Sequence, residues 1–227
     1  MRTQHRHDNR FSPLGEKFIA LTARQEADNA FYIKLNIHNS DLEIEKEIYR
    51  CKRFSQPPDG DMNVVYDKGI IYQTCLDRIF VAAVAEGIID VLNFKGEKLY
   101  SLDPPAEPVK VTEMHRKRYL DYYKAGPLKG QWERFEKQIK FPAVFPKVRF
   151  FNVADGKVYV LTYKKEGEKS EFMVFTLEGK LVKRVMVPLV EMEMAVDYYP
   201  YTIKGGKLYQ LVENQDEKWD LEVNAID

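Results

Sequence analysis

The segment from Lys147 to Pro188 constrains the fold of this chain most, because it reads as four short strands joined by tight turns. Asp155-Gly156 is typical of a two-residue hairpin turn, and Glu178-Gly179-Lys180 is a second tight turn. The runs between the turns are rich in Val, Phe, Tyr and Thr, which favour pleated, half-buried surfaces. The four expected strands are Val148–Val153, Lys157–Tyr163, Phe172–Leu177 and Leu181–Val187. Four consecutive antiparallel strands of this kind form one blade of a β-propeller.

Three other segments repeat this pattern. Their expected second strands align with that of the first segment, each beginning with a cation and carrying an aromatic residue at the second or third position. The aligned runs are KFIAL (17–21), RIFVA (78–82), KVYVL (157–161) and KLYQL (207–211). A Pro-rich loop and a long insertion make the spacing uneven, and without them the period falls within the range of propeller blades. The sequence therefore predicts a single all-β propeller domain over residues 1–227, with about four visible blades at about 11–50, 61–103, 147–188 and 198–227.

The first and last blades each show three strands. The residues ahead of Phe11 carry too little apolar content to supply an innermost strand, so we expect the chain to enter the first blade part-way. The last blade is expected to comprise Tyr201–Lys204, Lys207–Val212 and Trp219–Ile226. Because an open arc leaves strand edges unpaired, self-association is expected.

The insertion at about 107–146 has a helical character. Thr112 is a candidate N-cap for EMHRKRYLDYYK, which has no Gly, Pro or β-branched residue. A second helix is expected over QWERFEKQIK, with Trp132, Phe135 and Ile139 on one face, before Pro142 and Pro146 end helical structure.

The insertion is also a candidate lid or docking arm for an acidic partner. Between Val109 and Phe141, nine Lys and Arg residues outnumber four acidic residues, and a local surplus of positive charge steers acidic partners. The interleaved aromatic residues either contact a partner or fix the helices to the propeller face. The candidate partner-binding residues are Arg116, Lys117, Arg118, Tyr119, Tyr122, Tyr123 and Trp132.

Together, three segments resemble a known family, the bacterial six-bladed β-propeller proteins of the NHL-like and TolB-like type. They are the blade RIFVA…IIDVLNFKGEKLYSL, the insertion PVKVTEMHRKRYLDYY and the return FPAVFPKVRFFNVADGKVYVLTY. The resemblance covers about Asp61 to Asp227. It implies six blades and an exported, periplasmic or envelope protein, of which this chain is the C-terminal four-blade portion or a short member. It brings no catalytic motif to place on this sequence.

Composition restricts the partners. The 35 basic and 35 acidic residues cancel, so global charge gives no reason to expect nucleic acid as a partner. No run is apolar enough for a membrane span, and Met1–Arg10 lacks the apolar stretch of a signal peptide.

Cys51 is expected to be a loop thiol and Cys75 a buried strand residue, without a disulfide between them. The chain contains no metal, P-loop or nucleophile-elbow motif, and a weak metal site at His5-Arg6-His7 is less favoured than a solvated tail.

Catalytic propellers gather ionisable side chains at the ends of the innermost strands. The candidates at those ends are Arg149, Lys204, Asp67 and Asp155, each of which is also explained by a turn or rim position. The carboxylates of Glu191, Glu193 and Asp197 read as a solvated connector. We therefore expect no catalytic, metal or cofactor residue.

The sequence favours a binding or scaffold module for an unknown protein or polysaccharide. The first alternative is a propeller-type hydrolase or lyase with a site at the central channel, which convergence of three or more ionisable residues there would indicate. The second alternative is a purely structural assembly domain.

Overall fold

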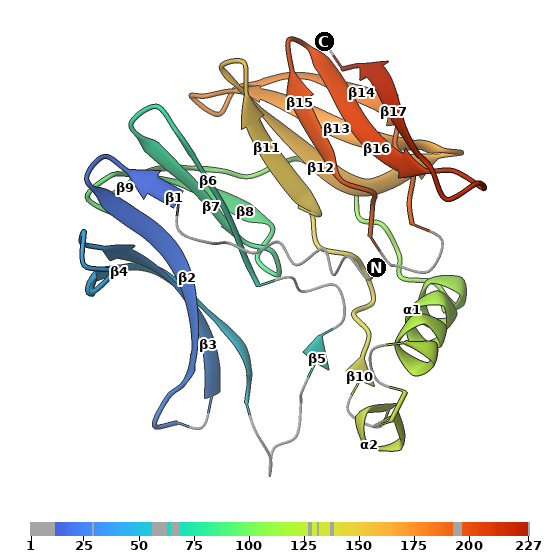
Figure 1. Ribbon diagram of the computed structural model, residues 1–227, viewed down its shortest axis with the longest axis horizontal. Helices are drawn as coiled ribbons and strands as arrows, with labels where there is room; N and C mark the ends of the chain where they lie inside the picture. Colours follow the sequence, from blue (N-terminus) through green and yellow to red (C-terminus); the bar gives the residue numbers. More distant parts are fainter. Residues whose placement is uncertain are drawn as a thin grey trace.

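Four antiparallel sheets follow one another along the chain and are arranged as an open fan (Figure 1). The computed structural model describes residues 12–28, 30–55, 63–64, 69–126, 129–130, 132–136, 139–192 and 197–226. In each sheet the strands lie side by side in sequence order. The first sheet comprises β1 (Ser12–Leu14), β2 (Lys17–Gln25), β3 (Ala30–His38) and β4 (Ile44–Ser55), and the second β6 (Ile70–Cys75), β7 (Arg78–Ala83), β8 (Ile88–Asn93) and β9 (Lys98–Leu102). The third comprises β11 (Phe150–Ala154), β12 (Lys157–Glu166), β13 (Lys169–Thr176) and β14 (Leu181–Pro188), and the fourth β15 (Tyr201–Lys204), β16 (Lys207–Glu213) and β17 (Trp219–Ala225).

These sheets are propeller-like blades, so the predicted all-β fold class is confirmed. The four aligned runs all begin second strands, in β2, β7, β12 and β16, as the repeat predicted. The prediction that the first blade lacks an innermost strand is wrong, because β1 pairs with β2 in that place. A three-residue strand with a central proline shows no alternation in the sequence, and proline is tolerated at the edge of a sheet.

The insertion contains fewer helical residues than predicted. Helix α1 (Glu113–Ala125) follows Thr112 as its N-cap residue, in agreement with the sequence. Helix α2 covers only Trp132–Glu136, and Ile139 lies instead in the two-residue strand β10 (Ile139–Lys140), which pairs in parallel with β5 (Asn63–Val64). The prediction that Ile139 lies on a helical face is therefore wrong. A helix this short depends on tertiary packing, and the β-branched Ile139 pairs with β5 instead. None of the helices in the described residues is long and apolar enough to cross a bilayer.

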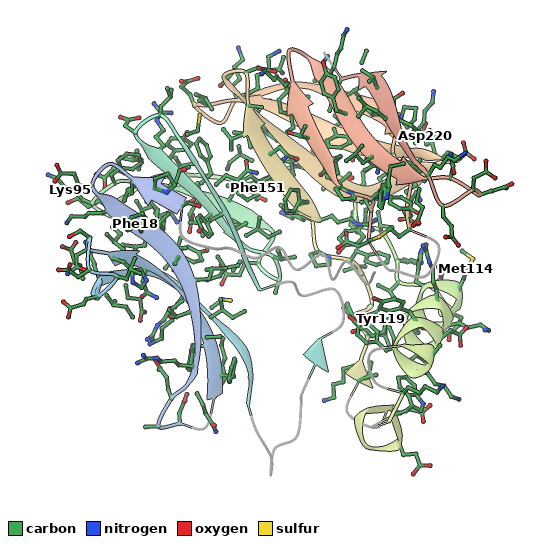
Figure 2. The ribbon with its side chains drawn as sticks, viewed as in Figure 1. Phe18, Lys95, Met114, Tyr119, Phe151 and Asp220 are labelled. Atoms are coloured by element: carbon green, nitrogen blue, oxygen red, sulfur yellow. The ribbon has the colours of Figure 1, made fainter. Side chains whose placement is uncertain are left out.

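Three of the four apolar clusters of the described core are layers between neighbouring blades, and the fourth joins Val111 and Phe145 of the insertion to Tyr163. Leu35, Ile79 and Val81 belong to the layer between the first and second blades. Phe80, Phe151 and Val160 belong to the layer between the second and third blades, and Figure 2 labels Phe151 there. The layer between the third and fourth blades holds Tyr159, Leu161, Phe172, Leu208 and Ile226. Successive residues of β12 therefore enter different layers, as side chains that alternate across a strand must.

Burial differs between inner and terminal blades. In β12, six consecutive residues from Val158 to Tyr163 are buried, because both faces of the third blade are covered. In β17, Trp219 and Asp220 are exposed and burial then alternates between exposed and half-buried positions from Leu221 to Ala225, because only one face meets a neighbour. The far face of the fourth blade consequently exposes Leu211, Trp219, Leu221 and Val223.

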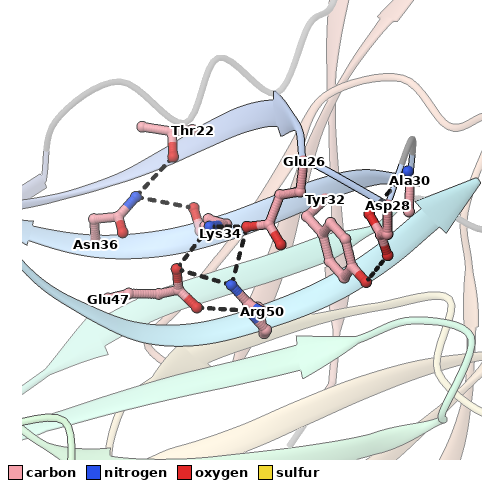
Figure 3. Close-up of polar contacts among 9 residues, drawn as sticks. All are labelled: Thr22, Glu26, Asp28, Ala30, Tyr32, Lys34, Asn36, Glu47 and Arg50. Atoms are coloured by element: carbon pink, nitrogen blue, oxygen red, sulfur yellow. Dashed lines mark hydrogen bonds and ion pairs between the residues drawn. The ribbon is translucent and has the colours of Figure 1, made fainter.

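The far face of the first blade is polar instead. Lys34 pairs with Glu26 and Glu47, and Arg50 contacts the same two carboxylates (Figure 3). Asn36 donates to the hydroxyl oxygen of Thr22 at 2.8 Å beside this network. The two ends of the fan thus have opposite character, with ions on one terminal face and apolar side chains on the other.

A single polar residue shapes the turn that leads into the last strand of each of the four sheets. Its side-chain oxygen accepts hydrogen bonds from the backbone N–H groups two and four residues further on. Its own N–H donates to the carbonyl four residues on. The residues are Asn39, Asn93, Thr176 and Asn214. Side chains of this kind hold a turn by bonding locally to the backbone, so the four blades share the turn as well as the strands.

Two of these turns also connect neighbouring blades. Gly96, at a φ of +75°, lies against Ile48 of β4 so closely that an added Cβ would come within 2.2 Å of Ile48 Cγ2. Gly179 occupies the same place in the next blade and faces the ring of Tyr100 on β9. Glycine is required at position 96 by both the backbone conformation and the contact.

No disulfide joins Cys51 to Cys75, as predicted. Cys75 ends β6 and packs against the layer between the second and third blades. The assignment of Cys51 to a loop is wrong, because it lies in β4, pairs with Ile33 and packs against the first layer. The basic residues Arg50 and Lys52 flank Cys51 and interrupt the apolar pattern, so the expected strand ended at Tyr49, whereas β4 continues to Ser55.

Removing Phe151 should destabilise the whole fan. Its side chain is fully buried between two blades, and Phe→Ala substitutions in cores cost about 3–5 kcal/mol. We expect Phe151→Ala to lower the free energy of unfolding by that amount in urea titrations. Leu99→Ala is the control, because Leu99 is 50% exposed on β9, and its substitution should cost less than about 1 kcal/mol. Equal losses in the two variants would contradict the layered core.

Candidate functional site

Ionisable side chains gather at the end of the blades where one blade leads into the next. In a four-stranded meander, the start of the innermost strand, the hairpin between the second and third strands, and the end of the outermost strand all lie at one end. We call this the connection end. Arg149 directly precedes β11, Lys165 lies near the β12–β13 hairpin, and Glu191 and Tyr198 lie between β14 and β15. The insertion joins β9 to β11, so α1 also begins at this end (Figure 1).

A single carboxylate organises this group, which we call the Glu191 cluster: Glu191, Arg118, Arg149, Lys165 and Tyr198. Oε1 of Glu191 lies 3.1 Å from a guanidinium nitrogen of Arg149. Oε2 lies 2.6 Å from a guanidinium nitrogen of Arg118 and 3.3 Å from Nζ of Lys165. Three cations from α1, the third blade and its hairpin therefore meet one carboxylate from the connection to the fourth blade.

Arg149 is the most buried cation of the Glu191 cluster. Its side chain is 6% exposed, it donates to the hydroxyl oxygen of Tyr198 at 2.9 Å, and the Tyr198 hydroxyl lies 2.8 Å from that of Ser170. The guanidinium carbon lies 3.9 Å from the centroid of the Tyr198 ring and 5.0 Å from that of Tyr163. Aromatic faces stabilise a desolvated guanidinium electrostatically, so Arg149 is held by a carboxylate and by two aromatic rings.

Electrostatics keep this cluster charged. Burial alone would raise the pKa of Glu191, but the charge of Arg149, reinforced by Arg118 and Lys165, outweighs burial and lowers that pKa from 4.5 to about 2. The carboxylate is therefore ionised at neutral pH. With three cations around it, the cluster carries a local excess of positive charge.

A second set of contacts holds the start of α1. His115 meets the ring of Phe145 edge-on at 4.9 Å, and Phe145 stacks on Tyr163 at 4.2 Å between ring centroids. The Nδ1 atom of His115 accepts a hydrogen bond from the backbone N–H of Thr112. Burial lowers the pKa of His115, and the positive charge of Arg118 adds to this against the opposing charge of Glu191. The ring is therefore neutral at physiological pH and acts as a packing and capping group.

The strands of the third blade also hold the beginning of the insertion. Arg184 on β14 donates to the carbonyl of Pro105 at 2.6 Å. Lys164 on β12 pairs with Glu107 at 3.1 Å. The insertion is thus attached at its entry, at the start of α1 and through Arg118.

The candidate partner-binding residues of the insertion divide between internal and outward positions. Arg118 belongs to the Glu191 cluster, and Trp132 is 8% exposed. Arg116 pairs with Glu113 and lies over the ring of Phe141, and Tyr119 contacts the rings of Tyr123 and Phe141. Tyr122 and Tyr123 are half-buried and meet edge-on. Lys117 is 78% exposed and pairs with Asp121 on the outward side of α1, where Met114 also lies (Figure 2).

The other sequence candidates lie apart from one another. Lys204 is exposed at the end of β15, away from the connection end. Asp155 forms the β11–β12 turn and accepts a hydrogen bond from the N–H of Gly206, linking two blades. Asp67, Glu193, His5 and His7 lie outside the described residues. The described part of the chain contains no group of three His, Cys, Asp or Glu side chains placed to hold a metal ion.

The interpretation of Glu191 as a solvated connector residue is wrong, because its side chain is 17% exposed and contacts three cations. The sequence around it, VEMEMAVDYY, gives no sign of which acid turns inward. Lys165 and Tyr198 were missed for the same reason. A faint signal exists for Arg149, a charged residue within the apolar run VRFFNV that leads into β11.

Comparison with known proteins gives no family. No family model matches the chain, and no curated protein matches it. Among solved structures, the chain is similar to a protein of unknown function from Bacteroides caccae, with a TM-score of 0.35 and 12% identity over 91% of this chain and 60% of that one. It is also similar to BBS1N in complex with ARL6DN, with a TM-score of 0.35 and 11% identity over 91% of this chain and 46% of that one. The AfRom2 CNH domain matches with a TM-score of 0.31 and 11% identity, over 97% of this chain and 65% of that one. The chain therefore spans less than two thirds of each of these chains, and similarities this distant identify neither a family nor a function.

Neutralising Glu191 should destabilise the protein in a pH-dependent way. Glu191→Gln leaves three cations without a counter-charge, and a pKa lowered by more than two units corresponds to about 2–3 kcal/mol after allowance for solvent screening. Because the folded-state pKa is depressed, this stability is fully present above pH 4.5 and is lost as the pH falls towards 2. We expect urea titrations to show the full deficit of the variant at pH 7 and a shrinking one below pH 4.5.

Glu113→Gln is the matched control for that measurement. Glu113 is 87% exposed and pairs with Arg116 on the surface of α1, so its loss should cost less than about 0.5 kcal/mol at any pH. A Glu191→Gln deficit that stayed constant from pH 7 to pH 3 would contradict the charge interpretation.

Proposed function

We propose that this chain is a binding or scaffold module that presents its helical insertion to a protein partner. The observation that carries the proposal is the state of α1. None of its residues is buried, so it adds little to the cores, yet Arg118, His115 and the entry contacts fix it to the connection end. A helix held rigidly but left uncovered suits docking, because little ordering entropy remains to be lost on binding.

The chemistry of the uncovered surface favours an acidic partner. The outward stripe of α1 alternates in sign through Glu113, Lys117, Asp121 and Lys124 and contributes no net charge. The surplus of positive charge lies at exposed lysines outside this stripe: Lys110, Lys129 and Lys140. Electrostatic surplus at the rim of a docking surface accelerates association and makes it sensitive to salt.

Two finer predictions remain part of this proposal. The resemblance to the NHL-like and TolB-like six-bladed proteins is supported by the order of blade, insertion and return. Location in the bacterial cell envelope rests on that resemblance alone. A polysaccharide in place of an acidic protein is an alternative partner that the experiment below distinguishes.

A hydrolase or lyase is the second candidate, and one observation favours it. Arg118, Arg149, Lys165 and Glu191 converge at the connection end beside the innermost strands, which is where catalytic propellers place their sites. The pKa values in the cluster argue against this second candidate. Proton transfer at neutral pH needs a group with a pKa near 7, whereas Glu191 is held ionised and the pKa of Arg149 is raised by Tyr198, Tyr163 and Glu191 in spite of burial. The cluster fits attachment of the insertion better than acid–base catalysis.

Charge reversal on the insertion should weaken binding to an acidic probe. We expect Lys124→Glu/Lys129→Glu to raise the dissociation constant for a polyglutamate peptide at least tenfold at low salt, measured by fluorescence anisotropy. The control is Lys95→Glu/Lys180→Glu, which makes the same charge change at exposed turns on the opposite end of the blades. An equal rise of the dissociation constant in the two variants would show that the peptide responds to overall charge and does not bind at the insertion. Binding to heparin but not to polyglutamate would assign the surface to polysaccharide and contradict the protein-docking proposal.

A further inference from the structure

The outer face of the fourth blade leaves a group of apolar side chains uncovered. In β16 and β17, Tyr209 lies opposite Val223 and Leu211 lies opposite Leu221, so these four side chains share one face. Trp219, opposite Glu213, extends the same face. Leu211, Trp219, Leu221 and Val223 are between 46% and 60% exposed. Contiguous apolar side chains on a sheet face mark a surface that another molecule covers.

From this face we propose that two copies of this chain form a two-fold symmetric dimer through the outer faces of their fourth blades. The proposal is independent of the docking role of the insertion. Its first support is internal: at each of the three layers, an apolar sheet face packs on another apolar sheet face. The fourth blade presents a face of the same kind, and a second copy supplies its match.

Head-to-tail association is disfavoured by the other end of the fan. The outer face of the first blade carries the ion network of Lys34, Arg50, Glu26 and Glu47 (Figure 3). Packing apolar side chains onto that network would remove four ions from water without supplying new partners. A self-complementary contact between identical faces avoids this cost, and two-fold dimers are the commonest oligomers.

The charges at the rim of the face select the orientation of the dimer. Lys204 and Lys207 lie opposite each other at the end of the face formed by the β15–β16 turn. Glu213 lies at the other end, beside Trp219. Lys207 and Glu213 are six residues apart on β16, which is about 20 Å at the rise of a β-strand.

A two-fold axis that lies in the interface at right angles to the strands makes the strands of the two copies antiparallel. Lys207 of each copy then meets Glu213 of the other, and the apolar centres coincide. An axis parallel to the strands would place lysine against lysine and glutamate against glutamate. Charge complementarity therefore fixes the antiparallel arrangement.

Sedimentation velocity between 5 and 100 µM tests the face. We expect a dimer for the wild type, and a dissociation constant raised at least 100-fold for Leu221→Glu, whose charge would lie at the apolar centre of the contact. Leu99→Glu is the matched control, because Leu99 is similarly exposed on β9, and it should remain dimeric. Circular dichroism spectra of all three proteins should coincide. A wild type that is monomeric at 100 µM, a Leu221→Glu dimer, or a ladder of species larger than the dimer would each overturn the proposal.

A charge exchange tests the orientation with variants that leave the apolar centre intact. Lys207→Glu and Glu213→Lys should each weaken their own dimer at least tenfold, because each places like charges at both ends of the contact. An equimolar mixture of the two variants should restore the wild-type affinity, since a copy with two acidic rim positions then faces a copy with two basic ones. If Lys207→Glu leaves the dissociation constant unchanged, the antiparallel dimer is wrong. If the mixture associates no better than its components, the two rims do not meet.

Discussion

Every sheet in this chain has two faces, and the fold depends on what covers each of them. Because side chains alternate across a strand, one strand serves two interfaces: Val158 and Val160 of β12 face the second blade, whereas Tyr159 and Leu161 face the fourth. Each blade is thus stabilised by its neighbours rather than by a core of its own. The stability of such arrays comes largely from nearest-neighbour interfaces. The turns held by Asn93 and Thr176, with Gly96 against Ile48 and Gly179 against Tyr100, keep successive blades in register at their outer edges.

This dependence explains which parts of the fold the sequence predicted. Turn dipeptides such as Asp155-Gly156 and runs of β-formers carry local information, so the four blades, their second strands and the N-terminus of α1 follow from the sequence. The strand β1 and the position of Cys51 in β4 do not, because a three-residue strand shows no alternation and the basic residues beside Cys51 interrupt the apolar pattern of β4. The end of α2 was misplaced for a related reason. Ile139 is decided by pairing with Asn63, 76 residues earlier in the chain, and no local preference reports that contact.

The candidate site was less predictable than the fold, since its character depends on which side chains become buried. Glu191 and Glu193 have the same chemistry and nearly the same sequence context, yet the low pKa of Glu191 arises from Arg118, Arg149 and Lys165, which lie 73, 42 and 26 positions earlier. The composition shows how many charged residues the chain carries, but it does not show which of them pair. The regular turn residues Asn39, Asn93, Thr176 and Asn214, by contrast, were visible in the sequence and were missed because they occupy different distances within an uneven repeat.

The Glu191 cluster and the outer face of the fourth blade are both made of side chains that the packing of blades alone does not satisfy. The cluster pairs its charges within the chain, whereas the apolar face is left exposed. Inserting a helical segment between two blades creates polar surface at the connection end, and the chain compensates by pairing the buried guanidinium of Arg149 with a carboxylate from the next connection. The fourth blade leaves the apolar side chains of Leu211, Trp219, Leu221 and Val223 about half exposed to water. A buried charge must be paired within the chain, because an unpaired one would destabilise the fold through its lost hydration. An apolar face is tolerated in water until another surface covers it. The internal pairing of the Glu191 cluster therefore fits an attachment point, and the unpaired apolar face of the fourth blade fits a place of assembly.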